Sequence, residues 1–379
     1  MWDLIVIGGG PAGSSAALAA LQQRPTARVL LLDRADFPRD KACGDGIAPH
    51  ALDILLTLGF DPAAVVEGYR PVDRLELGFA CGPQVRGLMQ RPAHVVPRAV
   101  FDARLVEAAV ARGAVLRRQR VRTVTHASDC VLVDGEAARV VVGADGANGV
   151  VRRQVGVSSP PDGTVAVAIR GYAPVRREHA EVQVITFARS GWPAYAWTFP
   201  LGDGRANIGY GEVVRPGAPL RRTQLLDRLD ELLPSVSTGA TDLRAHHLPL
   251  STGRPRQPDG RVLLAGDALS LVNPLTGEGI YYAVHSGALA GRAAVRRGVV
   301  AEPGAAYRRD LAAALGRHLR HTSAVASLAS RSWVFAAGVK AAARHPAVFD
   351  DLVELGLGRG LLTPRVVSGL AASLLLRRR

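Results

Sequence analysis

The stretch DLIVIGGGPAGSSAALAALQQ, residues 3–23, predicts the fold around which the rest of the chain is organised. A short apolar run is followed directly by glycines and then by a helical pattern of small apolar residues. Gly8, Gly10 and Gly13 form the pattern G-x-G-x-x-G. The first glycine permits a tight turn, the second lets the backbone approach a pyrophosphate, and the third lets the helix pack close to the strand. The start of the helix then offers free N–H groups and the positive end of its dipole to a phosphate.

The segment RVLLLDR, residues 28–34, predicts the second strand of the same unit. It ends at Asp33, where a carboxylate can hydrogen-bond the hydroxyl pair of a ribose. A lone G-x-G-x-x-G pattern is a weak signal, but the succession of strand, glycines, helix, strand and acid is a strong one. We therefore expect a dinucleotide-binding domain rather than a glycine-rich turn in an unrelated α/β unit.

Two later segments indicate which dinucleotide is bound. VVVGADGANGVVRR, residues 140–153, predicts a strand that ends at Asp145. Residues 260–291 predict a strand, a loop and a long helix of small residues, with Asp267 at the end of the strand. Asp267 is suited to hold ribityl or pyrophosphate oxygens, and the start of the helix can face the pyrimidine ring of a flavin with backbone N–H groups. NAD requires nothing comparable, so these segments favour FAD.

Taken together and in this order, the three segments resemble the FAD-binding elements of the para-hydroxybenzoate-hydroxylase-like flavoproteins. The resemblance implies that Arg98, at the start of a predicted helix, lies beside the flavin, and that Val121 lies near the adenine. A helix-capping or salt-bridging role is the alternative for Arg98. The predicted cofactor-binding residues are Gly8, Gly10, Pro11, Ala12, Gly13, Asp33, Arg34, Cys43, Gly44, Arg98, Val121, Asp145, Gly146, Gly266, Asp267, Pro274, Gly277, Gly279 and Ile280.

Two further motifs narrow the family. KACGDG, residues 41–46, resembles the K-x-C-G-x-G loop of the geranylgeranyl reductase family. PAYAWTFPLGDGRANIGYG, residues 193–211, resembles its P-x-Y-x-W-x-F-P and G-x-G pattern, although Pro193 stands one residue nearer to Tyr195 than in some relatives. The resemblance implies an FAD enzyme that reduces carbon–carbon double bonds of prenyl chains. Hydride would pass from reduced flavin to one alkene carbon, and an acid would protonate the other.

Three aromatic residues in this last stretch alternate along the sequence, so in a strand their rings share one face. By itself such a face is ordinary sheet core. Because FAD-binding segments stand on both sides of it in the sequence, we interpret the rings as the apolar wall of a prenyl-sized pocket over the flavin. A turn at residues 202–204 predicts a hairpin that pairs 195–199 with 206–211. The predicted substrate-binding residues are Tyr195, Trp197, Phe199, Pro200, Gly209 and Gly211.

The predicted catalytic residues are Cys43, Tyr195 and Trp197. The sequence leaves the proton donor open between Cys43, Tyr195 and an ordered water. An inert, buried thiol is the alternative for Cys43. No second G-x-G-x-x-G is present, so the electron donor stays open between NAD(P)H and an external reductase or ferredoxin.

A flavin monooxygenase that hydroxylates or epoxidises a specialised metabolite is the alternative function, because that chemistry needs a shaped pocket rather than a motif. Halogenation fits less well. The string YAWTFP resembles the W-x-W-x-I-P motif of flavin-dependent halogenases, which also need a lysine that accepts hypohalite. The only lysines are Lys41, inside the glycine loop, and Lys340, near the C-terminus.

The order of strand and helix patterns predicts an α/β protein. We expect a Rossmann-like FAD-binding βαβ domain, an interleaved antiparallel-sheet substrate domain and a helical C-terminal region. The predicted FAD-binding parts are residues 1–71, 98–158 and 256–300, the predicted substrate domain comprises residues 72–97 and 159–255, and the helical region comprises residues 301–379.

Composition excludes several classes of protein. The net charge is +14, but the 47 basic residues are scattered rather than striped, so we expect no nucleic-acid partner. Three cysteines at unrelated spacings predict neither disulfides nor a metal site. The absence of a signal-peptide pattern predicts a cytoplasmic protein. The segment PRVVSGLAASLLLRRR, residues 364–379, predicts a terminal helix packed on the body, with contact to a membrane surface as the alternative. The oligomeric state is not indicated.

Overall fold

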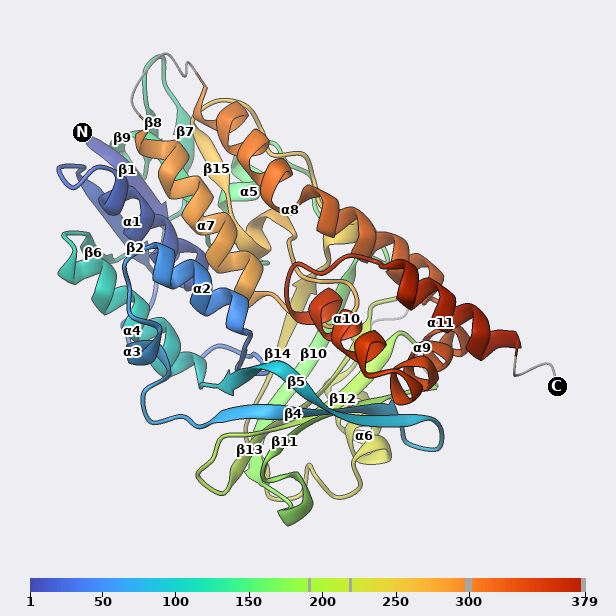
Figure 1. Ribbon diagram of the computed structural model, residues 1–379. Helices are drawn as coiled ribbons and strands as arrows, with labels where there is room; N and C mark the ends of the chain where they lie inside the picture. Colours follow the sequence, from blue (N-terminus) through green and yellow to red (C-terminus); the bar gives the residue numbers. More distant parts are fainter. Residues whose placement is uncertain (190–191, 218–219, 297–301, 376–379) are drawn as a thin grey trace.

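Two β-sheets organise the molecule, and Figure 1 shows them one above the other. The computed structural model describes residues 1–189, 192–217, 220–296 and 302–375. The first sheet contains the predicted dinucleotide-binding unit. Its parallel strands, in order, are β6 (Val115–Arg118), β2 (Val29–Asp33), β1 (Trp2–Ile7) and β9 (Glu136–Gly143), and β15 (Val262–Leu264) also pairs with β9. The hairpin of β7 (Val124–His126) and β8 (Val131–Val133) extends this sheet from β9.

Helices α1 (Pro11–Gln23) and α7 (Ile280–Val295) cover one face of the first sheet, with their backbones in direct contact (Figure 1). Two glycines of α7 make this approach feasible. A Cβ atom at Gly287 would lie 2.0 Å from the carbonyl oxygen of Ala12, and one at Gly291 would lie 2.0 Å from that of Ala16. The small-residue composition of the helix therefore serves close packing on α1.

The second sheet is the one predicted to hold the substrate. Its strands, in order, are β14 (Thr241–Pro249), β10 (Val165–Pro174), β13 (Arg205–Val213), β12 (Ala194–Pro200), β11 (Val182–Phe187), β4 (Pro71–Phe79), β5 (Gln84–Val95) and β3 (Gly46–Ile47). The expected hairpin is confirmed, because Trp197 pairs with Gly209 across β12 and β13. The expectation of an antiparallel sheet is wrong for one pair, since β11 and β4 run parallel. A long crossover connection joins these two strands, and such connections permit parallel pairing.

The two faces of the second sheet have different neighbours. On one face, residues such as Ala196 and Ile208 pack against Leu225 and Leu229 of α6 (Arg222–Leu232). Side chains alternate along a strand, so the odd-numbered residues of β12 face the other way, toward the first sheet. The three aromatic rings of β12 therefore share the face that looks toward the dinucleotide-binding unit.

The C-terminal region is helical, as expected, and lies along the edge of both sheets (Figure 1). Its helices are α8 (Pro303–Leu328), α9 (Ser332–Arg344), α10 (Pro346–Leu357) and α11 (Pro364–Leu375). Phe349 of α10 packs on β5, where Gly87 makes room: a Cβ at Gly87 would lie 2.7 Å from the ring. Helix α11 packs on α9 and buries Val366, so the terminal helix lies on the body of the protein. The arginines at 377–379 lie outside the described residues.

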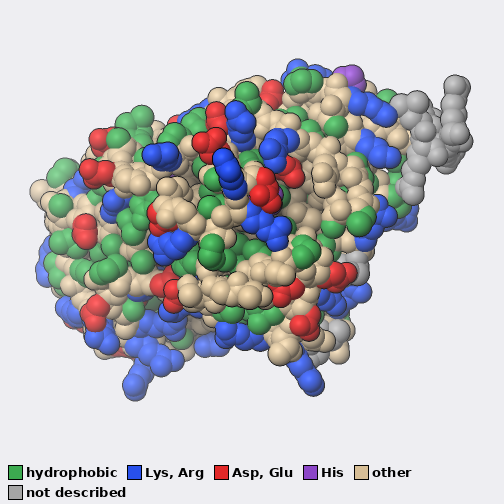
Figure 2. All heavy atoms as spheres, turned by 90° about the horizontal axis from the view of Figure 1, so that it is seen from below, with side chains coloured by type: hydrophobic (Ala, Val, Ile, Leu, Met, Phe, Trp, Pro, Cys, Tyr) green, Lys and Arg blue, Asp and Glu red, His purple; other side chains and the backbone are tan. Residues whose placement is uncertain are grey.

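Four further helices and three 3-10 turns complete the described part of the chain. The remaining elements are α2 (Pro49–Thr57), α3 (Pro62–Val66), α4 (Arg98–Ala111), α5 (Val151–Gln154), η1 (Arg177–His179), η2 (Ser251–Gly253) and η3 (Gly266–Leu269). Within the part of the chain that the structure describes, no helix combines the length and the apolar character needed to cross a bilayer. On the face seen in Figure 2, lysine and arginine side chains are dispersed among acidic and apolar ones.

Candidate active site

One cavity of about 690 Å³ runs between the two sheets. At one end it meets the C-terminal ends of β1, β2 and β9 and the N-termini of α1, α4 and α7. At the other end it is lined by β4, β5, β11, β12 and α10. Ligands of open parallel sheets bind beyond the carboxyl ends of the strands, so the first end is the expected place for a dinucleotide.

The nucleotide end is built from backbone rather than from side chains. A Cβ at Gly13 would lie 1.7 Å from the carbonyl oxygen of Gly8, and one at Gly8, where φ is +105°, would lie 2.3 Å from that of Ala144. A Cβ at Gly10 meets no described atom nearer than 3.6 Å, on Arg39. No side chain among the described residues caps the N-terminus of α1. Its first N–H groups are therefore available to a phosphate.

Asp33 is the last residue of β2 and lines the nucleotide end of the cavity. Its Oδ2 accepts a hydrogen bond from the backbone N–H of Gly9 at 2.8 Å, and its Oδ1 accepts one from Ala35 at 3.0 Å. The carboxylate shares the wall with Arg34 and Val121. The structure thus brings together the residues that the sequence assigned to ribose and adenine.

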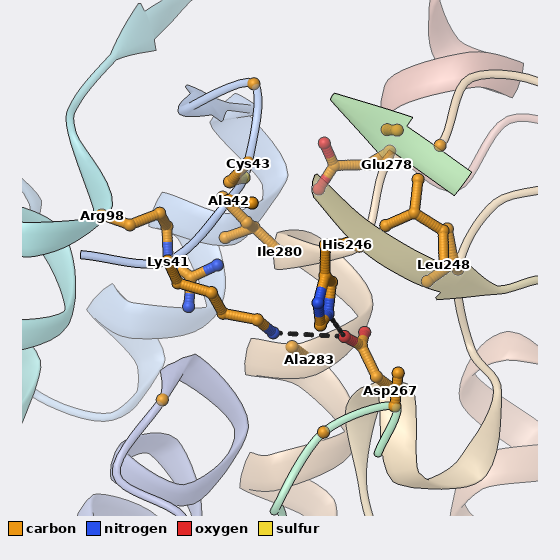
Figure 3. Close-up of a pocket in the computed structure, with 18 of the residues that line it drawn as sticks. Lys41, Ala42, Cys43, Arg98, His246, Leu248, Asp267, Glu278, Ile280 and Ala283 are labelled. Atoms are coloured by element: carbon orange, nitrogen blue, oxygen red, sulfur yellow. Dashed lines mark hydrogen bonds and ion pairs between the residues drawn. The ribbon is translucent and has the colours of Figure 1, made fainter. Parts of the chain in front are cut away.

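Three polar side chains from distant parts of the chain, those of Lys41, His246 and Asp267, meet in the cavity (Figure 3). The Oδ2 of Asp267 lies 3.3 Å from Nζ of Lys41 and 3.8 Å from Nε2 of His246. Burial alone would raise the pKa of Asp267, but Lys41 and His246 outweigh burial and hold this pKa well below its ordinary value. The cluster ties the 41–46 loop and β14 to the first sheet, because each side chain comes from a different one of these parts.

Arg98 lines the same region from the start of α4. Its Nε and Nη2 donate to the two carboxylate oxygens of Asp102 at 2.7 and 2.8 Å, so the salt-bridging role considered from the sequence is present. The guanidinium also faces the thiol of Cys43. Burial raises the pKa of Cys43 more than Arg98 lowers it. Cys43 is therefore a neutral thiol at physiological pH, able to donate a proton.

Comparison with known proteins agrees with this geometry. A family model described as an FAD binding domain matches residues 1–203. The chain is 33% identical over 333 residues to a menaquinone reductase of Mycolicibacterium smegmatis, which covers 78% of this chain and 77% of the relative. It is 31% identical over 324 residues to digeranylgeranylglycerophospholipid reductase 1 of Methanopyrus kandleri, with 78% and 80% covered. The chain belongs to the geranylgeranyl reductase family of FAD-dependent oxidoreductases.

Solved structures share the fold of this geranylgeranyl reductase family member. A geranylgeranyl bacteriochlorophyll reductase-like protein of Thermoplasma acidophilum superposes with a TM-score of 0.77 at 18% identity, over 98% of this chain and 96% of the other. A flavin-dependent brominase superposes with a TM-score of 0.69 at 16% identity, over 100% of both chains. At these identities the likeness establishes the fold alone.

The prediction of FAD is confirmed, and the residues of the cavity fit this cofactor. In the glycine cradle, Gly8 has no room for a Cβ atom, whereas Gly10 has open space beside it. A bound pyrophosphate requires this combination of a tight turn and a free approach to the backbone. Two buried polar atoms in the cavity wall, Oδ1 of Asp145 and Nε2 of His246, lack a hydrogen-bond partner among the described residues. At the N-terminus of α7 the N-cap residue Gly279 has no side chain, and the side chain of Glu278 accepts from the N–H group of Tyr281 in the first turn. These groups would hold the phosphates, the ribityl chain and the pyrimidine edge of FAD.

A buried clamp fixes the 41–46 loop to the second sheet. The Nδ2 of Asn207 donates to the carbonyl oxygen of Cys43 and to Oδ2 of Asp45, each at 2.8 Å, while its Oδ1 accepts from Nε1 of Trp197 at 2.8 Å. Tyr172 donates to the same Oδ2 of Asp45 at 2.6 Å. Burial raises the pKa of Asp45 to about 6, although the bonds from Tyr172 and Asn207 oppose the rise. No sequence motif indicated this clamp, because its members come from separate strands and a loop.

The three rings of β12 line the cavity, as predicted, but their polar atoms are engaged elsewhere. The hydroxyl of Tyr195 donates to the carbonyl oxygen of Thr276, and the indole N–H of Trp197 is held by Asn207. Phe199 lies against the 41–46 loop, where a Cβ at Gly44 would come 3.4 Å from its ring. The rings therefore form an apolar wall in which the hydroxyl of Tyr195 and the indole N–H of Trp197 are held by hydrogen bonds to the protein.

Four predicted site residues do not line the cavity among the described residues. Pro200 points to the other face of β12, because it follows Phe199 in an alternating strand. Gly209 was expected to leave room for a ligand, but the room is taken by the indole of Trp197, which a Cβ at Gly209 would approach to 2.2 Å. Gly13 and Gly266 lie behind the wall and permit close packing, the latter with φ at +59°.

Glu278 is a functional candidate that sequence reasoning passed over, although it stands inside the predicted Gly277–Gly279 turn. Its Oε1 accepts from the backbone N–H of Tyr281 at 2.8 Å, and its carboxyl group points toward Cys43 (Figure 3). Burial raises the pKa of Glu278 to about 7, against the opposing backbone N–H groups of Tyr281 and Ile280. A carboxyl group that is half protonated at neutral pH is suited to general acid chemistry.

Proposed function

We propose that this protein reduces carbon–carbon double bonds of a prenyl chain attached to a larger molecule. The observation that carries the proposal is one continuous cavity, which joins the FAD cradle to a wall of three aromatic rings and then to an apolar end. A prenyl chain offers only apolar area and π-faces for recognition, and such a wall matches both. The relatives named for menaquinone and for digeranylgeranylglycerophospholipid support this substrate class.

Reduction of an alkene requires a hydride at one carbon and a proton at the other. When bound, reduced FAD supplies the hydride. The protein has to place the double bond, exclude water and provide the proton. The ring wall supports the first two tasks, because Trp197 is 5% exposed and closes the cavity on the sheet side.

We propose Glu278 and Cys43 as the residues that provide the proton. Both line the cavity and face each other across it, and burial raises the pKa of each, so that the thiol is protonated and the carboxyl group is partly protonated at neutral pH. Tyr195 is less suited, because its hydroxyl proton is committed to the carbonyl oxygen of Thr276 and burial raises its pKa above the ordinary value.

One anaerobic experiment tests the reaction against the monooxygenase alternative. The holoenzyme is reduced with dithionite, which replaces the physiological electron donor, and mixed with a geranylgeranyl-bearing substrate. We expect flavin reoxidation together with a saturated product in the absence of oxygen. Turnover that begins only when air is admitted would overturn the proposal in favour of an oxygenase.

A pH profile tests the proton donor. If Glu278 donates the proton, single-turnover reoxidation of the wild type falls about tenfold for each pH unit above 7, because the protonated fraction falls at that rate. Glu278→Gln should be slower and lose this slope. Cys43→Ser is the matched comparison, and a slope that disappears in this variant while Glu278→Gln keeps it would assign the proton to the thiol.

We also propose that the C-terminal helices touch the membrane surface from which an apolar substrate is taken. Leu328 at the end of α8 and Trp333 at the start of α9 are 61% and 40% exposed, and Arg331 lies between them in the chain. Exposed apolar side chains beside a cation are typical of an interfacial segment. In a flotation assay with anionic vesicles, the wild type should float with the vesicles. The double variant that combines Leu328→Ser and Trp333→Ser should have a bound fraction that is severalfold smaller. Equal flotation of both would contradict this proposal.

A further inference from the structure

Among the described residues that line the apolar end of the cavity from β4, β5, β11 and α10, the one polar side chain is that of Gln183. Gln183 lies in β11 beside Leu75 of β4, in register, and two residues before Ile185, so all three share the cavity face of the sheet. Its side chain is 4% exposed. The described residues that line this end from β4, β5, β11 and α10 are otherwise Leu75, Leu77, Ala93, Ile185, Leu352, Val353, Gly356 and Leu357.

The amide nitrogen of Gln183, Nε2, is buried without a hydrogen-bond partner among the described residues. The other buried amides of the protein are well paired: Asn207 bonds three groups, Gln257 donates to Val262 and accepts from Leu264, and Asn273 donates to Tyr282. An unpaired amide in an apolar setting is destabilising, and native proteins retain such groups where a ligand completes them. The position therefore indicates a ligand group that bonds to Gln183.

The surroundings limit the chemistry of that ligand group. No lysine, arginine or histidine stands among the described lining residues of this end, so a phosphate or carboxylate placed here would be buried without compensation. A neutral oxygen meets no such penalty. The unpartnered Nε2 is a donor, and a carbonyl oxygen or a hydroxyl oxygen can accept its hydrogen bond, so either oxygen suits it.

We infer that Gln183 is a specificity-determining residue that hydrogen-bonds a neutral oxygen atom, a carbonyl or a hydroxyl, of the prenylated substrate. The inference rests on the proposed function and adds to it that the bound part of the substrate is not hydrocarbon alone. Because β11 is the neighbour of β12, the backbone of Gln183 lies about one strand spacing, ~4.8 Å, from the strand that carries the aromatic wall. Gln183 thereby fixes how far along the chain the substrate is seated against the rings.

The test is ligand binding to the oxidised holoenzyme with molecules that contain no reducible chain double bond. The three probes are a naphthoquinone with a saturated isoprenoid side chain, the matching saturated isoprenoid alcohol and the matching saturated hydrocarbon. Binding is followed by the shift in flavin absorbance and by tryptophan fluorescence. We expect Gln183→Leu to weaken binding of an oxygen-bearing probe about tenfold and to leave the hydrocarbon nearly unchanged. If only the quinone probe binds more weakly to the variant, the partner of Gln183 is a carbonyl oxygen. If only the alcohol probe binds more weakly, the partner is a hydroxyl oxygen.

Leu77→Met is the matched control, because it alters the same wall without a hydrogen-bonding group and should affect all three probes alike. A second readout is thermal stability without added probe, which Gln183→Leu should raise by removing an unpaired amide. Equal weakening of all three probes by Gln183→Leu, or a lower thermal midpoint, would assign Gln183 a structural role and overturn the inference. Failure of the wild type to bind any probe would overturn it as well. Since these probes cannot be reduced in their chains, selective binding together with absent turnover of an unsaturated substrate would contradict only the proposed function.

Discussion

The two ends of the cavity are built in opposite ways. At the nucleotide end, main-chain atoms of the first glycine turn and the uncapped start of α1 form the surface, and the side chains there are mostly charged and paired. At the apolar end, side chains from β4, β11, β12 and α10 form the surface, and the ring wall is held by hydrogen bonds to the protein. The nucleotide end therefore tolerates little change in backbone geometry, while the apolar end can change its specificity through single side chains.

Removal of the Trp197 ring should impair the apolar end of the cavity and leave the nucleotide end intact. Trp197→Ala deletes a buried indole, which costs about 3–5 kcal/mol of contacts. We expect turnover to be almost lost and FAD affinity to change by less than about threefold, because Trp197 lies beyond the cofactor cradle. Single-turnover reoxidation and FAD titration of the apoprotein measure the two effects, with Trp197→Phe as the milder comparison. Equal losses of turnover and of FAD affinity would show that Trp197 has a purely structural role.

Addition of one methyl group at Gly10 should impair the nucleotide end of the cavity and spare the apolar end. Gly10→Ala meets no described atom of the protein within 3.6 Å, so the apoprotein should keep its thermal midpoint. The methyl group takes space that a pyrophosphate needs, and overpacking of about 1–3 kcal/mol predicts FAD binding weaker by roughly tenfold to hundredfold. Gly316→Ala, where the nearest atom is also 3.6 Å away but in α8, is the matched control. Unchanged FAD retention in Gly10→Ala would contradict the placement of the phosphates.

The stability that the Asn207 clamp contributes should depend on pH. Asn207→Leu removes the partner of the Trp197 indole N–H, the partner of the Cys43 carbonyl oxygen and one of the donors to Asp45, and should lower the free energy of unfolding by about 1–3 kcal/mol. Because the folded-state pKa of Asp45 is raised to about 6 from 3.8, its neutral form stabilises the protein fully below pH 3.8, and this contribution is lost as the pH rises through about 6. Loss of the Asn207 donors disfavours the ionised carboxylate further. Urea unfolding should therefore show a larger deficit at pH 8 than at pH 5, and the opposite order would contradict the assignment.

The smallest effect is expected at Tyr195. Tyr195→Phe keeps the ring on the wall and removes one hydrogen bond to Thr276, worth about 0.5–1.5 kcal/mol. Turnover should stay within roughly threefold of the wild type, and FAD affinity should not change. A loss of two orders of magnitude in single-turnover reoxidation would make Tyr195 the proton donor after all.

The sequence predicted the nucleotide end well, because its signals are local. The glycines of the first turn, Asp33 and the turn at 277–279 each stand beside the element that positions them. The ring wall was also predictable, since alternation at 195, 197 and 199 fixes one face of a strand. Neither signal shows which atoms the side chains bind.

The parts that were missed depend on pairing between distant segments. Asn207 meets Asp45 only because β13 lies over the 41–46 loop, and Lys41 meets Asp267 only across the two sheets. The role of Gly209 was misjudged for the same reason: a glycine beside a predicted pocket can make room for a ligand or for a side chain, and only the register with Trp197 decides between them. The parallel pairing of β4 and β11 likewise follows from a long crossover that periodicity does not reveal.

The contact between α1 and α7 has a consequence for how the protein forms during synthesis. The cradle for the pyrophosphate is encoded in the first residues of the chain, yet Ala12 and Ala16 complete their packing only against Gly287 and Gly291. Contacts of such long sequence separation form slowly, because a large loop has to close first. A nascent chain that ends at residue 203, where the matched FAD-binding family model ends, carries the glycine motif without the helix that supports it. Competence to retain FAD is thus expected late in translation, after most of the chain has left the ribosome.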